Sequence, residues 1–232
     1  MLKGVVFDLD GVIVDSHPIH KQAWRAFLAH VGKEVSEAGL DFIFEGRKRG
    51  EILTHFLGEL SDHDIQLYGS KKDEFFRQES EVLKPIRGTI EFITNVRQAG
   101  LSLAVATSAS KQRAQWTLEH LELAEYFSVM VSGDDVALGK PNPGTYRMAA
   151  RRLLLPPNCL LAVEDSVSGV RSAIAAGLRC VAIAPTKHAG PLMEAGANRV
   201  VPSLMNLSVR DLEEMFNGRQ RADRNAVTAR LR

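Results

Sequence analysis

Short apolar runs alternate with segments of helical periodicity along most of the chain. The predicted strands, of buried or edge type, are Val5 to Phe7, Leu101 to Ala106, Ser128 to Ser132, Leu160 to Val163, Cys180 to Ile183 and Val200-Val201. The predicted helices between them are Thr89 to Gln98, Lys111 to Leu121, Thr145 to Leu155 and Ser168 to Ala176. Strands that alternate with helices predict an α/β fold with a doubly wound parallel sheet.

A different pattern follows the first strand. Ile19, Ala23 and Phe27 recur at helical spacing, and this pattern continues to about Leu83. It stops at Lys84-Pro85-Ile86-Arg87-Gly88, where proline and glycine indicate a linker. We therefore expect an inserted α-helical subdomain at residues 15–84 and an α/β core at residues 1–14 and 85–216. Residues 217–232 carry five arginines against one aspartate and are expected to form a polar, disordered tail.

Composition narrows the choice of partners and compartment. The formal net charge of the 232 residues is +1, so no overall field favours nucleic acid or a membrane surface. Cys159 and Cys180 are too few for a disulfide framework and are expected to be buried thiols. The sequence shows no signal peptide and no uncharged apolar stretch of membrane-spanning length. We expect a cytoplasmic monomer that binds a small molecule.

The strongest chemical signal is Asp8-Leu9-Asp10-Gly11, directly after the first strand. Residues two apart on a strand share a side, so both carboxylates should lie together where open α/β sheets bind ligands. A divalent cation would offset their repulsion, and Gly11 permits a turn that brings backbone N–H groups near an anion. A calcium loop is excluded, because Val12 and Ile19 stand where oxygen ligands are needed. This combination suits phosphoryl transfer.

Three more polar segments follow predicted strands. They are Thr107-Ser108-Ala109-Ser110, Gly139-Lys140-Pro141-Asn142-Pro143 and Glu164-Asp165-Ser166. The first offers hydroxyls and backbone N–H groups to a phosphate, the second a lysine as a point charge, and the third an acidic pair for a metal. Each alone is more often a turn, a helix cap or a solvated charge. Together they converge on one crevice, because the carboxyl ends of parallel strands meet there.

These four segments, in this order, resemble the motifs of the haloacid dehalogenase-like superfamily. The resemblance extends from about Leu2 to about Asn206 and is closest to the β-phosphoglucomutase-like group, which has an α-helical cap after the first strand. It implies a Rossmann-like core, a cap at residues 15–84 and a small phosphorylated metabolite as the partner. Dehalogenases and phosphonate-cleaving members of the superfamily lack the second acid, so Asp10 argues against both activities.

The resemblance also implies roles for the core residues. Asp8 would be the nucleophile that forms an aspartyl-phosphate, Asp10 the general acid and base, and Lys140 the charge that offsets phosphate and nucleophile. The implied phosphate ligands are Gly11, Ser108 (with Thr107 as the alternative), Ala109 and Lys140. The implied Mg²⁺ ligands are Asp8, the backbone carbonyl of Asp10, Glu164 and Asp165. A carboxylate that must approach an anionic phosphate needs such positive charges beside it.

The segment His17 to Trp24 is similar to the start of the β-phosphoglucomutase cap. His20 and Trp24 are one helical turn apart and share a face. From the residues alone, this is a core aromatic residue beside a surface histidine. The resemblance instead implies that His20 lies at the hinge and takes part in the acid/base network. Sugar-phosphate phosphatases of the group have a similar segment, so His20 does not separate the two activities.

A second candidate substrate contact in the cap is the basic loop Gly46-Arg47-Lys48-Arg49-Gly50. It is either an exposed charge cluster or an anion clamp. Arg49 matches the arginine that binds the distal phosphate in the mutase, and Lys72, with Lys71 as the alternative, matches its cap lysine. Glu45 stands where the mutase has a lysine, a departure that leaves the identity of the substrate open.

Three functions are compatible with these residues. The favoured one is a Mg²⁺-dependent phosphatase of small phosphorylated sugars or related metabolites, because phosphatases are the more frequent members of the group. The alternative is a β-phosphoglucomutase that interconverts β-glucose 1-phosphate and glucose 6-phosphate. The third is a non-catalytic module that binds metal or phosphate, which would not need Asp10, Lys140 and the acidic pair together.

Overall fold

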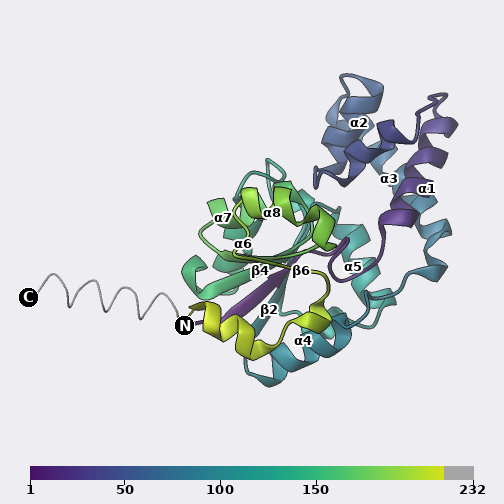
Figure 1. Cartoon of the computed structure of the whole chain (residues 1–232). Coiled ribbons are helices and arrows are strands. Elements are labelled where there is room, and N and C mark those ends of the chain that lie inside the picture. Colours follow the sequence, from purple (N-terminus) through teal and green to yellow (C-terminus); the bar gives the residue numbers. More distant parts are fainter. Residues whose placement is uncertain (217–232) are drawn as a thin grey trace, which may run out of the picture.

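The computed structural model describes residues 1–216, so the predicted tail at 217–232 lies outside the described residues. Its six strands form one parallel sheet in the order β3-β2-β1-β4-β5-β6. They are β1 (Gly4–Phe7), β2 (Ser102–Ala106), β3 (Val129–Val131), β4 (Leu160–Glu164), β5 (Arg179–Ile183) and β6 (Arg199–Val201). This sheet confirms the predicted α/β class (Figure 1).

The central strand β1 is buried on both faces because helices cover both sides of the sheet. Val6 lies opposite Ala104 of β2 and Ala162 of β4, and these residues belong to one core cluster. Phe7 points to the other face and packs edge-on against Phe92 and Phe127. A strand buried on both faces reads as a continuous apolar run, which is why this strand was recognisable in the sequence.

Five helices whose bounds lie within residues 1–216 pack around the sheet, and a further helix begins at Val209. The five are α4 (Thr89–Gln98), α5 (Lys111–His120), α6 (Gly144–Arg152), α7 (Val167–Ala175) and α8 (Ala189–Glu194). The prediction that one helix continues to Leu155 is wrong: Leu154 has a positive φ of 57° and is 90% exposed. The amide of Leu155 bonds to the carbonyl of Ala150, so the chain turns out of the helix. Helix α8 was not predicted. Cys180 is buried, whereas Cys159 is partly exposed, contrary to expectation.

Residues 17–78 form a separate helical lobe beyond the carboxyl end of β1 (Figure 1). Its helices are α1 (His17–His30), α2 (Arg49–Leu57) and α3 (Asp62–Gln78), and the last begins with a capping box formed by Ser61 and Asp64. The lobe has its own apolar cluster around Trp24 and Phe27. The segments that connect it to the sheet are hydrogen-bonded to each other, Ile86 N to Ile13 O at 3.0 Å.

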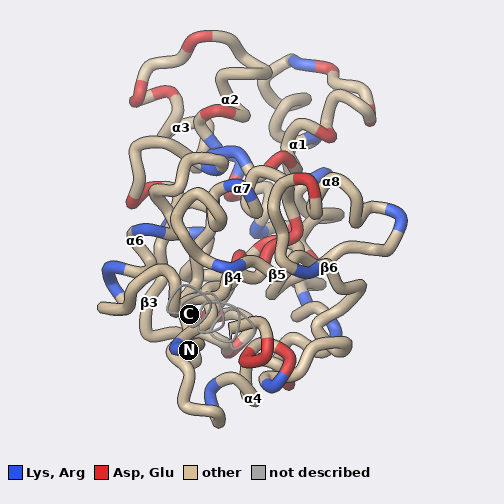
Figure 2. Tube along the Cα trace, turned by 60° about the vertical axis from the view of Figure 1, so that its left-hand side comes forward, with Lys and Arg blue, Asp and Glu red and all other residues tan. Residues whose placement is uncertain are grey.

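Basic and acidic residues are interspersed over both lobes (Figure 2). Among residues 1–216, no helix is long and apolar enough to cross a membrane.

Candidate active site

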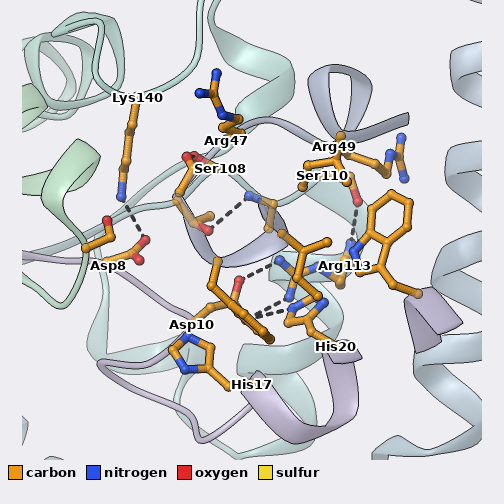
Figure 3. Close-up of a pocket in the computed structure, with 18 of the residues that line it drawn as sticks. Asp8, Asp10, His17, His20, Arg47, Arg49, Ser108, Ser110, Arg113 and Lys140 are labelled. Atoms are coloured by element: carbon orange, nitrogen blue, oxygen red, sulfur yellow. Dashed lines mark hydrogen bonds and ion pairs between the residues drawn. The ribbon is translucent and has the colours of Figure 1, made fainter. Parts of the chain in front are cut away.

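The segments that follow β1, β2, β3 and β4 bring the four motifs to one cavity under the helical lobe (Figure 3). The predicted residues that line it are Asp8, Asp10, His20, Arg49, Lys72, Ser108, Ala109, Lys140 and Asp165. Gly11 lines an adjoining groove, and Glu164 is fully buried. Asp73 and Arg113, which the sequence did not single out, also line the cavity.

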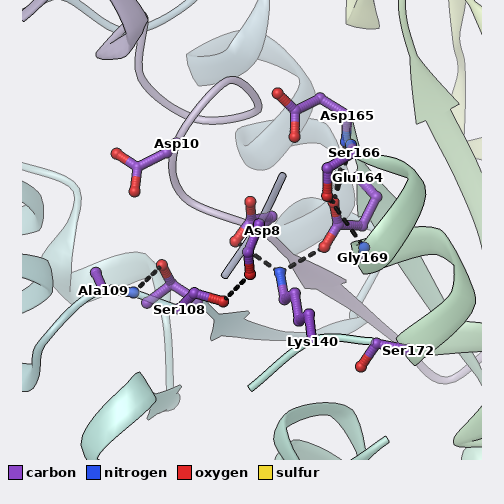
Figure 4. A network of polar contacts seen from close by, with 12 residues as sticks. Asp8, Asp10, Ser108, Ala109, Lys140, Glu164, Asp165, Ser166, Gly169 and Ser172 are labelled. Carbon is purple, nitrogen blue, oxygen red and sulfur yellow. Dashed lines mark hydrogen bonds and ion pairs between the residues drawn. The ribbon is translucent and has the colours of Figure 1, made fainter. Parts of the chain in front are cut away.

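Lys140 holds two carboxylates together in the interior. Its Nζ lies 3.0 Å from Asp8 Oδ1 and 2.5 Å from Glu164 Oε1, and its side chain is 1% exposed (Figure 4). Burial raises the pKa of Asp8 to about 7, with Glu164 and Asp10 adding to the rise and Lys140 opposing it. Burial would lower the pKa of Lys140, but the two carboxylates raise it, so the lysine stays charged. Asp8 is therefore a buried carboxylate beside a permanent positive charge.

Glu164 is held on all sides by protein donors. Its Oε1 accepts from Lys140 and from the Tyr146 hydroxyl at 2.7 Å. Its Oε2 accepts from the backbone N–H groups of Asp165 and Ser166 and from the Ser166 hydroxyl. A Cβ at Gly169 would overlap the Glu164 carboxylate, so glycine is needed there. No sequence motif marks Tyr146, which lies on α6 within an ordinary helical pattern.

Asp8, Glu164 and Asp165 form an acidic group that fits a cation. Each offers one oxygen, and these atoms lie within 4.8 Å of one another. Burial raises the pKa of Asp165 well above its ordinary value, and the charges of Glu164 and Asp8 raise it further. His17 Nε2 lies 3.4 Å from Asp165 Oδ2. Three carboxylates against one lysine leave an excess of negative charge, which a divalent metal would offset. Glu164 already accepts five hydrogen bonds from the protein. The carboxylates of Asp8 and Asp165 are therefore more accessible to a metal ion than that of Glu164.

Gly11 makes room for this acidic group. Its φ is 75°, in the left-handed region, and a Cβ there would overlap the Asp165 carboxylate. Its backbone N–H donates to Val14 O at 2.9 Å. Gly11 therefore shapes the turn, while its own amide is engaged within that turn.

Asp10 lines the same cavity as Asp8, and its charge raises the pKa of Asp8, but the two side chains are oriented differently. Its carboxylate points away from Asp8 (Figure 4). It accepts from Ser16 Oγ at 2.6 Å and from the two terminal nitrogens of Arg113 at 3.0 and 2.6 Å. His20 Nε2 lies 3.3 Å away. The period of two holds only within a strand, and β1 ends at Phe7.

Arg113 is the main partner of Asp10. It is 7% exposed, lies on α5 and contacts the ring of Phe76 in the helical lobe, 5.2 Å from the centroid. Burial would raise the pKa of Asp10, but Arg113 and His20 lower it well below its ordinary value. Arg113 follows Ser110, the N-cap of α5, by one turn. An arginine in the first turn of the helix after a phosphate-binding motif was the available signal for it.

The Ser/Thr segment after β2 is bonded within the protein and to the lobe. Ser108 Oγ donates to the carbonyl of Gly46 at 2.6 Å, and the amide of Ala109 donates to Thr107 Oγ1 at 3.1 Å. Lys48 Nζ donates to the carbonyl of Val136 at 2.7 Å. The basic loop therefore rests on the core in this structure. Ser108 and Ala109 line the cavity, and their role as phosphate ligands stays a prediction.

The lobe contributes a second set of buried charges. Arg49 NH1 lies 2.5 Å from Asp73 Oδ2, and Lys72 Nζ lies 3.0 Å from His20 Nδ1. Lys72 is buried and Arg49 is partly buried, and both form ion pairs with Asp73, so they are not members of an exposed charge cluster. Burial, followed by Lys72 and Arg113, lowers the pKa of His20 to about 3, so its ring is neutral.

The alternative residues of the loop and of α3 face elsewhere. Lys71 is exposed and pairs with Glu74 at 2.7 Å, so of the two candidate lysines Lys72 is the one at the cavity. Arg47 lies at the cavity rim and pairs with Glu45 at 2.9 Å.

Comparisons with known proteins agree with this geometry. Residues 5–183 match the family model described as haloacid dehalogenase-like hydrolase. The chain is 33% identical to the phosphorylated carbohydrates phosphatase of Thermotoga maritima, over 86% of this chain and 94% of that protein. It is also 33% identical to hexitol phosphatase A of Escherichia coli, over 78% of this chain and 82% of that protein. A solved structure of a CbbY variant from Rhodobacter sphaeroides, in complex with xylulose-(1,5)bisphosphate, superposes with a TM-score of 0.82. It has 28% identity and covers 91% of this chain and 99% of that one.

Proposed function

Because the chain belongs to the haloacid dehalogenase-like hydrolase family, we propose that it is a Mg²⁺-dependent phosphatase of small phosphorylated sugars or related metabolites. The family resemblance and the hydrolase class predicted from the four motifs are thereby confirmed. The observation that carries the proposal is the position of Asp8. Its buried carboxylate lies between the Lys140 ammonium and the acidic group of Glu164 and Asp165.

In the proposed first step, an Asp8 oxygen attacks the phosphorus and the bond from phosphorus to the sugar oxygen breaks. The leaving oxygen takes a proton from Asp10, and the product is an aspartyl-phosphate. In the second step Asp10 takes a proton from water, and the water oxygen attacks the same phosphorus. Inorganic phosphate leaves and the Asp8 carboxylate is restored. Lys140 offsets the charges of Asp8 and phosphate in both steps.

Asp10 must turn for these steps. Its oxygens are bonded to Ser16 and Arg113 and point away from Asp8. Leaving Arg113 removes the interaction that lowers its pKa most, so Asp10 can hold the proton that it transfers. Ser108, whose hydroxyl now donates to the carbonyl of Gly46 in the lobe, would bind the phosphoryl group after leaving that carbonyl. Motion of the lobe relative to the core would change the contact of Ser108 with Gly46 and the surroundings of Asp10.

Asp8, Asp165 and the backbone carbonyl of Asp10 would hold the metal, with Glu164 close behind. When bound, Mg²⁺ supplies positive charge to the phosphoryl oxygens.

A mutase would use the same core residues and differ in the acceptor, a sugar hydroxyl in place of water. The names of the relatives favour the phosphatase, since they describe phosphatases of phosphorylated carbohydrates and of hexitol phosphates. A non-catalytic module is disfavoured, because Asp8, Asp10, Lys140 and the acidic pair are all retained around one cavity.

Magnesium should stabilise the protein as well as activate it. At about 100 times its dissociation constant, Mg²⁺ bound only to the folded state adds about 2.7 kcal/mol, which raises the Tm of a chain of this size by about 5–10 °C. EDTA-treated protein should release no phosphate from sugar phosphates until Mg²⁺ is added. Asp165→Asn should lose both responses, whereas Glu213→Gln, an exposed acid, should keep them. Phosphate release that persists in EDTA, with a Tm that ignores Mg²⁺, would refute the metal site.

A further inference from the structure

The part of the cavity formed by the helical lobe contains a buried carboxylate, Asp73, at the end of the candidate anion clamp. Asp73 is 6% exposed. Its Oδ2 accepts from Arg49 NH1 at 2.5 Å and from Ser110 Oγ at 2.9 Å, and its Oδ1 lies 3.7 Å from Lys72 Nζ. These four side chains come from α2, α3 and the segment after β2, and all four line the cavity.

Asp73 is ionised. Burial alone would raise its pKa, but Lys72, Arg113 and Arg49, together with the hydrogen bond from Ser110, lower it below its ordinary value. The charge of Arg49 is therefore already offset by a carboxylate in direct contact. The guanidinium has further N–H groups to donate, and the carboxylate has further lone pairs to accept with.

The buried charges in this part of the cavity nearly balance. Arg113 is paired with Asp10, and Arg49 with Asp73. Lys72 is the remaining cationic side chain of this group, and burial lowers its pKa to about 7. A second anionic group of a substrate would find no unpaired arginine among these residues and would be placed against the Asp73 carboxylate.

We propose that Asp73 is a specificity-determining residue. It makes this end of the cavity a subsite for an uncharged, hydroxylated chain, so that the enzyme selects sugar or polyol monophosphates and rejects bisphosphates. A substrate hydroxyl can donate to Asp73 while it accepts from Arg49 or Lys72. A phosphate can only accept at neutral pH, and like charges placed together in a desolvated site repel strongly. This inference rests on the proposed phosphatase function and names its substrate class.

The same carboxylate separates the phosphatase from the mutase. A mutase cycle that is primed by a 1,6-bisphosphate holds one phosphate at Asp8 and the other under the lobe. Asp73 opposes the second of these phosphates. In the sequence analysis, Arg49 alone indicated a preference for substrates with a second phosphate.

The test compares a hexitol 6-phosphate with glucose 1,6-bisphosphate. Wild-type protein with Mg²⁺ should release phosphate from the monophosphate with a kcat/KM at least about 30 times higher. Asp73→Asn keeps the shape and the contact with Ser110 but removes the charge. It should raise kcat/KM for the bisphosphate at least tenfold and lower that for the monophosphate. Adding Arg49→Ala to Asp73→Asn should abolish the gain.

Glu74→Gln is the matched control. It lies next to Asp73 on α3, but its carboxylate is on the exposed side and pairs with Lys71. It should leave both kcat/KM values within twofold of wild type, and its failure to do so would refute the assignment to Asp73.

A binding measurement separates the inference from the proposed function. Calorimetry of both ligands with the Asp8→Asn protein, with and without Asp73→Asn, needs no turnover. The affinity ratio should shift at least tenfold toward the bisphosphate when Asp73 is replaced. A wild type that prefers the bisphosphate, or a ratio that changes less than threefold, would overturn the inference. Absence of phosphate release together with a shifted ratio would instead refute the phosphatase and keep the subsite.

Discussion

Asp8→Asn is expected to lower kcat for phosphate release by about 10³-fold or more while the protein stays folded. An amide cannot form the aspartyl-phosphate, so the covalent route is lost. The fold should tolerate the change because asparagine has nearly the same shape. It also removes a buried charge whose pKa is already raised to about 7 by burial, Glu164 and Asp10. Lys140 keeps its bond to Glu164.

The measurement is phosphate release across a panel of sugar phosphates, with thermal unfolding of the same preparations. Asp41→Asn is the control, since Asp41 is an exposed acid outside the cavity. Activity of Asp8→Asn within tenfold of wild type would remove Asp8 from the role of nucleophile.

Lys140→Ala is expected to lose activity and also much of its stability. Lys140 is 1% exposed and is the cation between Asp8 and Glu164. Removing one partner of a buried ion pair leaves the other charges uncompensated, at about 3–5 kcal/mol. For a chain of this size, that corresponds to a fall in Tm of about 6–20 °C.

The loss of stability in Lys140→Ala should depend on pH. The pKa of Asp8 is raised in the folded state, so its ionisation opposes folding as pH rises through about 7. Lys140 opposes this rise, and without it the pKa of Asp8 is higher still. In EDTA, the difference in Tm between wild type and variant should therefore be larger at pH 8 than at pH 5. Lys71→Ala, which removes an exposed lysine, should change Tm little at either pH. A Tm of the Lys140→Ala protein within about 2 °C of the wild-type Tm at pH 8 would contradict the buried ion pairs of Lys140 with Asp8 and Glu164.

The core of the site could be predicted because its residues follow strands that the sequence reveals. Asp8 and Asp165 directly follow β1 and β4, which are buried along their whole length, and parallel strands bring such positions to one edge. Lys140 follows the edge strand β3 and was found from its Gly-Lys-Pro loop. The direction of Asp10 could not be predicted in this way. It lies in the turn after β1, where Gly11 has a positive φ and the alternation of a strand no longer applies.

The partners of these residues depend on the tertiary arrangement. Arg113 is 103 positions from Asp10, and Asp73 is 37 positions from Ser110. The first pair joins two distant segments of the α/β core, the turn after β1 and α5, and the second joins α3 of the helical lobe to the segment before α5. No local period carries such information, so Arg49 looked like a free anion ligand until its buried carboxylate partner was seen.

The most direct test of the proposed function is a product assay of wild-type protein with Mg²⁺. The substrates are a hexitol 6-phosphate and β-glucose 1-phosphate, the latter primed with a trace of glucose 1,6-bisphosphate. We expect inorganic phosphate in an amount equal to the sugar phosphate consumed, dependent on Asp8, with no build-up of glucose 6-phosphate. Accumulation of glucose 6-phosphate without inorganic phosphate would contradict this expectation and identify a mutase.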